Sequence, residues 1–235
     1  MNYITKKASV VAIFIAILSV AVFAAAANYS LFGDAELVNP GNNSPTAAQI
    51  RSSAAIAPNY GGIDFNVPTG LTIADLDTLS TDYKFLAGQC AGGSPRFQLN
   101  VTDGTNSGNI MVYLGIGGDY NNCGSSAWTN TGNLLEASDL VETFQLPGGT
   151  YQQSYGSVQS AYGTYEVTGI QLVMDSYWSS GTQTMLADNV QINRSTYTFE
   201  SANSCKNGGW QTFTLAPGPF ANQGQCVSYY AKGGQ

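Results

Sequence analysis

The most regular alternation of apolar and polar residues along the chain lies in residues 165–193. Such a period of two indicates strands with one face buried and one face in water. The intervening SYWSSGTQ carries Ser and Gly residues typical of tight turns. We therefore predict two long antiparallel strands joined as a hairpin. The first would bury Val167, Ile170, Leu172 and Met174; the second would place Met185, Ala187, Asn189 and Gln191 on one face and Leu186, Asp188, Val190 and Ile192 on the other.

Further short strands are predicted from similar patterns, separated by Gly-rich turns. A turn at residues 103–106 makes a second hairpin of the strands on either side of it. Residues 134–146 fit either a short amphipathic helix or a loop ending in a strand, and residues 151–162 fit a surface helix or turn that covers one edge. No strand–helix alternation is present, so we predict an all-β, antiparallel, jelly-roll-like sandwich. The expected additional strands are 33–38, 47–56, 61–67, 83–86, 95–101, 109–116 and 196–199.

Residues 1–27 have the pattern of a secretory signal peptide. Lys6 and Lys7 precede an apolar run at 10–22, and small residues offer a cleavage site near 25–27. A membrane anchor is the alternative, but the run is short for a span of about 20 residues. The expected organisation is a signal peptide (1–27), a β-sandwich domain (28–199) and a C-terminal tail (200–235), in a protein that is secreted, extracellular and at the cell surface, with no membrane partner after cleavage.

The amino-acid composition excludes several classes of function. The 235 residues include no His, only 10% charged residues and a net charge of −7, or −9 (−7 minus 2) without Lys6 and Lys7. So few cations make nucleic acid an unsuitable partner. The absence of His excludes Ser-His-Asp and Cys-His catalysis and His-ligated zinc. Carboxylates, Tyr and Lys remain as acid–base groups.

Four cysteines in an exported chain indicate disulfides, and four allow three pairings. We favour Cys90–Cys123 and Cys205–Cys226, because the two pairs fall in separate compositional segments. The second pair would staple a tail too small for an extensive core. Within this tail, Asn222 is placed to cap a short helix through residues 226–231, ended by Gly233.

Two motifs resemble known families. The tail's CKNGGW (205–210) and NQGQCV (222–227) resemble the C-terminal module of many secreted bacterial proteins of unknown role, which implies an extracellular bacterial location and surface attachment. The LADNV stretch (186–190) is similar to the late strand of carbohydrate-binding and concanavalin-like jelly rolls. This second resemblance implies a fold, and a fold does not carry function with it.

Aromatic residues in polar loops suggest glycan binding, because sugar rings stack on exposed aromatic faces while Asn and Asp bind the hydroxyls. The alternative is that the rings pack over the ends of the sandwich. The predicted ligand-binding residues are Asp119, Tyr120, Asn122, Trp128, Tyr177 and Trp178.

Acidic residues raise two further hypotheses. The acidic residues make calcium the one candidate cofactor. The ion would use Glu36 on the first strand and Asp188 on the late strand, or Asp119 with loop carbonyls; the alternative is that these carboxylates are solvated. Glycoside hydrolysis would need two acids facing across a cleft. No spacing selects a pair among the candidates Glu36, Glu136, Glu142, Glu166 and Asp175.

Three functions follow from these features. The first is a secreted, non-catalytic module that binds glycan or associates with the cell envelope. The second is a polysaccharide hydrolase or lyase, for which two carboxylates, or a Tyr with a Lys or Arg, must converge in one groove. The third is a purely structural or adhesive surface protein, with no concave aromatic face.

Overall fold

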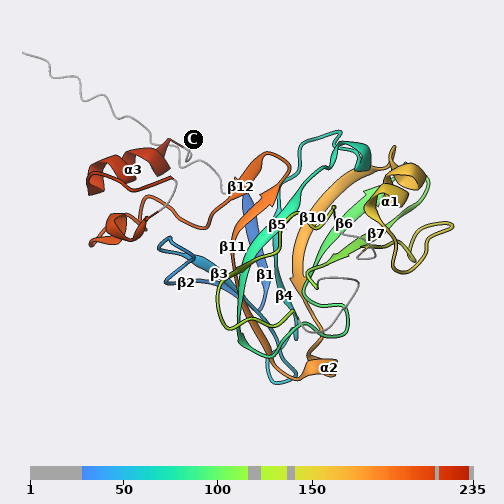
Figure 1. The fold of residues 1–235 in the computed structure, drawn as a ribbon, viewed down its shortest axis with the longest axis horizontal. Coiled ribbons are helices and arrows are strands. Elements are labelled where there is room, and N and C mark those ends of the chain that lie inside the picture. Colours follow the sequence, from blue (N-terminus) through green and yellow to red (C-terminus); the bar gives the residue numbers. More distant parts are fainter. Residues whose placement is uncertain (1–27, 116–122, 137–140, 215–216, 233–235) are drawn as a thin grey trace, which may run out of the picture.

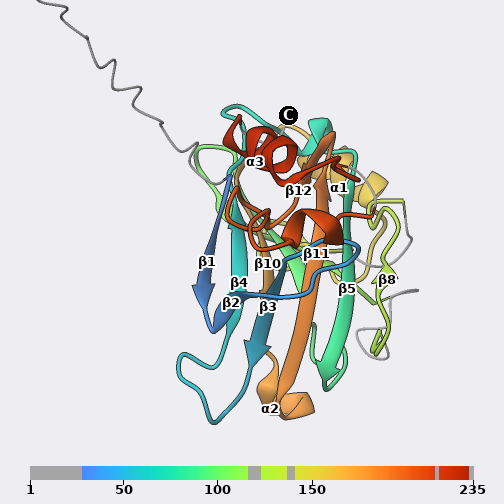
Figure 2. The ribbon, with the colours of Figure 1, turned by 90° about the vertical axis from the view of Figure 1, so that its left-hand side faces the viewer.

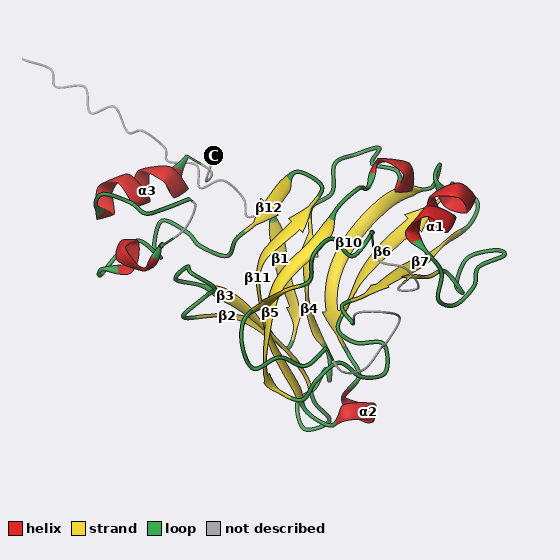
Figure 3. Ribbon diagram, viewed as in Figure 1, coloured by secondary structure: helices red, strands yellow, loops and turns green. Residues whose placement is uncertain are grey.

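The computed structural model describes residues 28–115, 123–136, 141–214 and 217–232, and these form a sandwich of two antiparallel sheets (Figures 1 and 3). The all-β prediction is confirmed. Sheet A has the order β1 (Tyr29–Gly33), β4 (Gly61–Phe65), β10 (Glu166–Met174), β6 (Arg96–Thr102), β7 (Ser107–Tyr113) and β9 (Val141–Glu142). Sheet B has the order β2 (Ala35–Val38), β3 (Ala47–Ser52), β11 (Gln183–Ile192), β5 (Leu79–Ala87) and β8 (Thr129–Asn130), with β12 (Ser195–Tyr197) beside β11.

The predicted central hairpin is wrong, although both of its strands exist. Strand β10 lies between β4 and β6 in sheet A, whereas β11 lies between β3 and β5 in sheet B. The short helix α2 (Tyr177–Ser180) carries the chain from one sheet to the other. Crossing between layers lets the apolar faces of the two strands meet across the core, which pairing within one sheet could not do.

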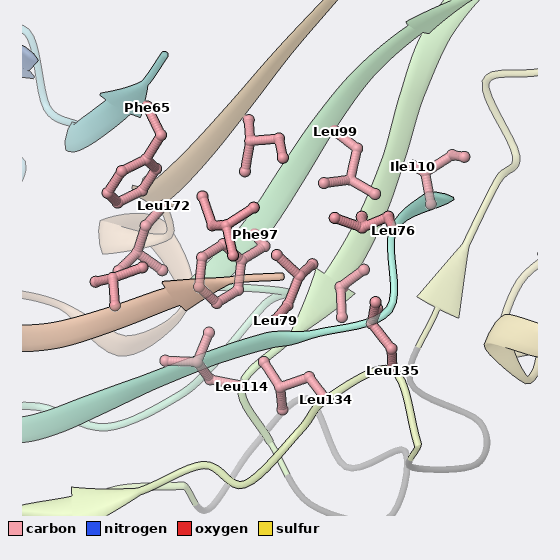
Figure 4. Packing of buried hydrophobic residues seen from close by; sticks show 14 of the residues in the cluster. Phe65, Leu76, Leu79, Phe97, Leu99, Ile110, Leu114, Leu134, Leu135 and Leu172 are labelled. Carbon is pink, nitrogen blue, oxygen red and sulfur yellow. The ribbon is translucent and has the colours of Figure 1, made fainter. Parts of the chain in front are cut away.

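The core lies between the two sheets and is built from their inward-facing side chains (Figure 4). Ile170 and Leu172 of β10 are both fully buried, as the alternation predicts. Each such side chain contributes about 1.5–3 kcal/mol through removal of its surface from water. The labelled core residues in Figure 4 include Phe65, Leu79, Phe97, Leu99, Ile110 and Leu172.

Strand β11 does not alternate regularly, which corrects the predicted division of its faces. Met185 and Ala187 face the core, but beyond them Val190 and Ile192 do so. The change follows a shift in register against β5 between Asp188 and Gln191. Asn189, within the shift, has a φ of 47°. A bulge of this kind inserts an extra residue and exchanges the two faces of the strand beyond it.

The remaining elements match the predicted ones with local differences. The expected strand at 33–38 corresponds to β2, and Gly33 is the last residue of β1; the chain passes from sheet A to sheet B after Gly33, whose φ is 61°. The second hairpin is confirmed as β6–β7. Residues 151–162 contain the helix α1 (Tyr155–Tyr162), which buries Tyr155 and Val158 against the core. The described part of 134–146 includes the short strand β9, which is followed by a turn. A 3₁₀ turn, η1 (Ile73–Asp75), precedes β5.

Both favoured disulfide pairings are confirmed. The Cα atoms are 5.2 Å apart in Cys90–Cys123 and 5.7 Å apart in Cys205–Cys226. The second bridge ties the segment before η3 (Gly209–Thr212) to α3 (Gln223–Ala231), which contains Cys226. These elements form a tail on the sheet B side of the sandwich (Figures 1 and 2). The Asn222 side chain caps α3 by accepting a 2.9 Å hydrogen bond from the N–H of Gln225.

The tail has a small apolar cluster of its own around its disulfide. Phe213 and Phe220 pack edge to face, with ring centroids 5.1 Å apart, and the half-buried Trp210 and Tyr230 pack against the cluster. Contacts between the tail region and the sandwich include a 3.3 Å hydrogen bond between the hydroxyls of Thr46 and Ser204. The predicted boundary near residue 200 therefore remains a prediction, supported by two separate apolar clusters.

The predicted signal peptide, residues 1–27, lies outside the described residues. Within the described ranges, no helix combines the length and the apolar character needed to cross a membrane.

Candidate ligand-binding site

A pocket of about 330 Å³ is lined by residues of sheet A and by residues at the start of α2. Helix α2 lies at one end of the sandwich (Figure 1). The described lining of the pocket comes from five segments that are remote in sequence: the turn before β6 with the first residue of that strand, the strand β7, the segment around β9, residue Tyr151, and residues 175–178 at the start of α2. The lining residues are Gly92, Gly93, Arg96, Met111, Tyr113, Glu142, Phe144, Tyr151, Asp175, Ser176 and Trp178.

The register of sheet A places the polar lining residues on one face. Phe97 and Leu99 of β6 point into the core, so their neighbours Arg96 and Gln98 point outward. Cross-strand partners share a face. Arg96 therefore lies beside Tyr113 on the outer face, and Gln98 lies in a row that crosses five strands: Asp64, Gln171, Gln98, Met111 and Glu142.

Asp64, Gln171 and Gln98 of this row are linked by hydrogen bonds that lead to Arg96. The Gln171 amide donates to Asp64 at 2.6 Å, the Gln98 amide donates to Gln171 at 3.1 Å, and Arg96 Nη2 donates to Gln98 at 3.2 Å. A connected chain of side chains restricts the rotamers of its members. The Arg96 side chain is thus held in one orientation at the edge of the pocket.

Arg96 and Asp175 form the charged wall of the pocket. Arg96 Nη1 and Nη2 each donate to one carboxylate oxygen of Asp175 at 2.8 Å, and Nη1 also donates to the carbonyl of Gly93 at 3.0 Å. The Arg96 side chain is 11% exposed, whereas that of Asp175 is 36% exposed. Two parallel charge-assisted bonds are both strong and directional, so they orient both groups.

Tyr113 and Glu142 form the floor. The Tyr113 hydroxyl donates a 2.7 Å hydrogen bond to Glu142 Oε2, and both residues are buried. Glu142 belongs to β9, where Met111 of β7 is its cross-strand partner. A buried carboxylate of this kind is stable only with hydrogen-bond donors around it. The floor therefore presents fixed oxygen atoms to whatever enters the pocket.

Three exposed aromatic side chains border the pocket, and we call them the aromatic rim: Trp178, Tyr151 and Phe144. Their exposed fractions are 69%, 66% and 40%. The rings of Phe144 and Tyr151 stack with centroids 4.9 Å apart and planes 12° apart. Trp178 belongs to another segment, at the start of α2. Large apolar surface left in water beside a polar cavity is typical of a binding site.

A turn that contains two glycines supports the charged wall of the pocket, because Arg96 donates to the carbonyl of Gly93. Gly92 and Gly93 have φ values of 58° and 80°, a conformation that glycine adopts readily. The carbonyl of Gly92 accepts a 3.0 Å hydrogen bond from the Ser176 hydroxyl, next to α2. The turn follows directly on Cys90, whose disulfide with Cys123 anchors the segment. The disulfide is thus part of the scaffold that carries the site.

Of the three predicted ligand-binding residues that the structure describes, Trp178 lines the pocket and the other two do not. Its neighbour Tyr177 is half-buried, and its N–H donates to the Ser52 hydroxyl at 2.8 Å. Trp128 is also half-buried and is not part of the lining. Asp119, Tyr120 and Asn122 lie outside the described residues.

Among the candidate carboxylates, Glu142 and Asp175 line this pocket together. Glu36, Glu136 and Glu166 are exposed and do not line it. Sequence reasoning did not find the following members of the site: Arg96, Tyr113, Phe144 and Tyr151. The only signal for Arg96 was its position at the start of an alternating strand, a position that also fits a solvated surface residue.

The two predicted calcium ligands have separate partners. Glu36 accepts hydrogen bonds from Gln49 at 3.0 Å and from Arg51 at 2.5 Å. Asp188 is fully buried and accepts hydrogen bonds of 2.8 Å each from the N–H of Asn42, the Ser44 hydroxyl and the N–H of Asn189.

Burial, and after it the nearby negative charge of Glu200, raise the pKa of the Asp188 carboxyl to about 7. The acid that acts electrostatically on Asp188 is therefore Glu200, and Glu36 is not among the causes. Within the described ranges, no three Asp, Glu, Cys or His side chains gather as metal ligands would. Calcium binding through Glu36 and Asp188 remains a prediction.

Comparisons with known proteins add little to this geometry. No family model matches the chain, and no curated protein matches it. Among solved structures, the chain is similar to the family 11 carbohydrate-binding module of the cellulosomal cellulase Lic26A-Cel5E of Clostridium thermocellum, with a TM-score of 0.41 and 14% identity over 73% of this chain and 90% of the module. It is also similar to an exo-beta-agarase, with a TM-score of 0.35 and 14% identity over 75% of this chain and 24% of the agarase. Because both TM-scores are below 0.5, nothing about the ligand of this chain follows from these likenesses.

Proposed function

We propose that this chain is a secreted or cell-surface β-sandwich module that binds a glycan, without catalysis, in the pocket beside the aromatic rim. The observation that carries the proposal is the exposure of Trp178, Tyr151 and Phe144 around one polar cavity. Isolated exposed apolar residues are normal on protein surfaces, but three rings at one pocket indicate a ligand.

The chemistry of the lining suits a sugar. Aromatic faces pack against the C–H groups of a pyranose ring, and the charged and hydroxyl groups below them bind its hydroxyls. Arg96 and Asp175 are already oriented by the hydrogen bonds between them, and Glu142 by the hydrogen bond that it accepts from Tyr113. Groups that are fixed before binding lose little side-chain entropy when the ligand arrives, which favours affinity.

The expected compartment agrees with this function. Two disulfides suit an oxidising environment outside the cytosol. The predicted signal peptide provides an export route, and a glycan or another component of the cell envelope is the partner that such a module would meet there. The tail, whose motifs resemble those of secreted bacterial proteins, is the candidate for surface attachment.

The test is a glycan array followed by calorimetry with any glycan that binds. We expect Trp178→Ala and Tyr151→Ala each to lower affinity about tenfold, the effect of losing one aromatic stacking contact. Trp128→Ala is the matched control, because Trp128 does not line the pocket. Glycan binding that is unaffected by Trp178→Ala and Tyr151→Ala would contradict the proposed site. An array without hits would contradict glycan binding and would leave the structural or adhesive hypothesis, for which self-association or cell-wall pull-down is the readout.

A polysaccharide hydrolase or lyase is the second candidate, because Glu142 and Asp175 line the same pocket as Tyr113 and Arg96. Each carboxylate has a hydrogen-bonded partner: Asp175 accepts from Arg96 with both oxygens, and Glu142 accepts from Tyr113. Such engagement is better suited to a binding wall than to a free acid–base pair. Turnover on a polysaccharide panel that is lost in Glu142→Gln would establish the enzyme, and no turnover on any substrate would favour the binding module.

A further inference from the structure

The charges that line the pocket do not cancel. Among the described residues of the lining, Arg96 is the one cation, and the carboxylates of Glu142 and Asp175 oppose it. Beyond residues 1–27 the chain has only five other Lys and Arg residues, and none of them belongs to the lining: Arg51, Lys84, Arg194, Lys206 and Lys232. The lining thus contributes one net negative charge, within a chain whose own net charge is −7.

The single cation is also directed away from an anionic ligand. Both Nη atoms of Arg96 are engaged by Asp175 at 2.8 Å, and the same two atoms also bind Gly93 and Gln98. A carboxylate or sulfate on the ligand would have to displace Asp175 from this pair. The ligand anion would then share the pocket with two carboxylates, which is unfavourable at low local dielectric.

The aromatic rim favours a ligand with a positive charge. The rings of Trp178 and of the stacked Phe144–Tyr151 pair border the same cavity as the two carboxylates. An ammonium group near the face of a Trp, Tyr or Phe ring is attracted by the ring quadrupole, and Trp gives the strongest attraction. A positively charged sugar would gain from the rings and from the net charge together, whereas a neutral sugar gains only from stacking.

We propose that the glycan unit held in this pocket is a positively charged amino sugar, as in a polymer that contains unacetylated glucosamine. This inference rests on the proposed glycan-binding function. The glycan-binding function and the preference for an amino sugar can fail separately. A protein that binds neutral glucose polymers as well as glucosamine polymers would confirm glycan binding and overturn the preference.

The experiment measures the affinities of the full chain for oligosaccharides of matched length and the same β-1,4 linkage. These are oligomers of glucosamine, N-acetylglucosamine and glucose, with oligogalacturonate added as the anionic member. We expect the glucosamine oligomer to bind about tenfold tighter than the glucose oligomer, in line with one cation–π contact in a charged pocket. We expect the N-acetylated oligomer to lose this advantage, because its nitrogen has no charge, and oligogalacturonate to bind more weakly than all three.

A matched pair of variants tests whether the preference for the glucosamine oligomer comes from the charge of this pocket. Glu142→Gln removes one negative charge from the pocket but keeps an oxygen that can accept the Tyr113 hydrogen bond, so we expect the ratio of glucosamine to glucose affinity to fall toward one. Glu166→Gln is the control, because Glu166 lies exposed at the other end of sheet A and its loss leaves that ratio unchanged. If Glu142→Gln does not fold, the salt dependence of the wild-type ratio replaces it: the ratio should fall at about 1 M salt, where the Debye length is about 3 Å.

Other outcomes overturn the proposal. Equal affinity for the glucosamine and glucose oligomers, or tighter binding of oligogalacturonate, would show that the charge of the pocket does not select the sugar. Displacement of the glucosamine oligomer by choline at similar concentration would mean that the pocket binds small cations in general. A ratio that neither Glu142→Gln nor high salt changes would move the preference to another part of the molecule.

Discussion

The guanidinium of Arg96 and the carboxylate of Asp175 form two parallel hydrogen bonds of 2.8 Å each, although 79 positions separate the two residues in the chain. Arg96 begins β6 and Asp175 directly follows β10, so the pairing of these two strands brings the residues together. This ion pair is continuous with the hydrogen-bonded row that leads to Asp64. The charged wall of the pocket is therefore also a link between strands of sheet A.

The first prediction concerns this pair. Arg96→Met leaves Asp175 without its cation, and we expect a loss of about 1–3 kcal/mol in the free energy of unfolding, the range for a hydrogen-bonded charged group. Asp175 is partly exposed, so the coupling between the two residues should be about 1 kcal/mol. A double-mutant cycle with Asp175→Asn, followed by denaturant unfolding, measures the coupling. A coupling free energy indistinguishable from zero would mean that the ion pair of Arg96 and Asp175 shapes the pocket without stabilising the fold.

The second prediction concerns the disulfide beside the site. Replacing Cys90 and Cys123 with Ala should cost about 2–4 kcal/mol of stability, because the bridge closes a loop with a sequence separation of 33. Glycan affinity should fall as well, since the glycine turn follows Cys90 directly. The corresponding change at Cys205 and Cys226 should loosen the tail and leave affinity unchanged. Equal effects of the two double variants on affinity would contradict a specific role for the first bridge.

The third prediction separates backbone strain from displacement of the rim. Gly92 and Gly104 both have positive φ, of 58° and 87°. A Cβ on Gly92 would lie 3.0 Å from the Trp178 ring and 2.5 Å from the Ser179 hydroxyl, whereas a Cβ on Gly104 would have no neighbour within 4 Å. We expect both Gly→Ala variants to lose about 1 kcal/mol through strain, and only Gly92→Ala to weaken glycan binding several-fold. Calorimetry and thermal unfolding of the two variants provide the comparison.

The fourth prediction concerns the bulge in β11. Asn189 has a φ of 47°, and its side-chain amide donates a 2.8 Å hydrogen bond to Asp82. Asn189→Ala and Asn189→Gly both remove this bond, but only alanine is strained in the left-handed conformation. We therefore expect Asn189→Ala to be less stable than Asn189→Gly by about 1 kcal/mol in denaturant unfolding. The reverse order would show that the bulge does not need a left-handed residue.

The fifth prediction concerns acid stability. Hydrogen bonds from the backbone and side chain of Asn106, and from the N–H of Thr105, hold the pKa of the Asp103 carboxyl well below its usual range. A carboxyl with a depressed folded-state pKa contributes stability above its unfolded value, near pH 4, and loses that contribution as the pH falls further.

The melting temperature of Asp103→Asn should accordingly decrease less on acidification below about pH 4 than that of the wild type. Glu136→Gln, which removes an exposed carboxyl from a different loop, should retain the wild-type slope. Identical slopes for all three proteins would remove Asp103 as a source of acid sensitivity.

Much of the fold was determined by local features of the sequence. The alternation around Ile170 and Leu172 predicts their burial, because a strand exposes alternate side chains to opposite sides whatever its partners are. Asn222 predicts the start of α3, because a helix cap depends on residues three positions apart. The four cysteines, taken with their distribution along the chain, indicate the two bridges that form.

Only the tertiary structure decided which strands pair and what meets at the pocket. The alternation of apolar and polar residues in two successive strands is the same whether they pair in one sheet or lie in opposite sheets. The pattern therefore predicted a hairpin of β10 and β11, although these strands belong to opposite layers. The aromatic rim and the carboxylates come from segments that are far apart in sequence, and their meeting depends on strand order and register, which no local pattern encodes. The polar loop around Trp178 is enough to predict this residue as a ligand-binding residue. That Arg96, Glu142 and Tyr151 line the same pocket depends on the tertiary structure.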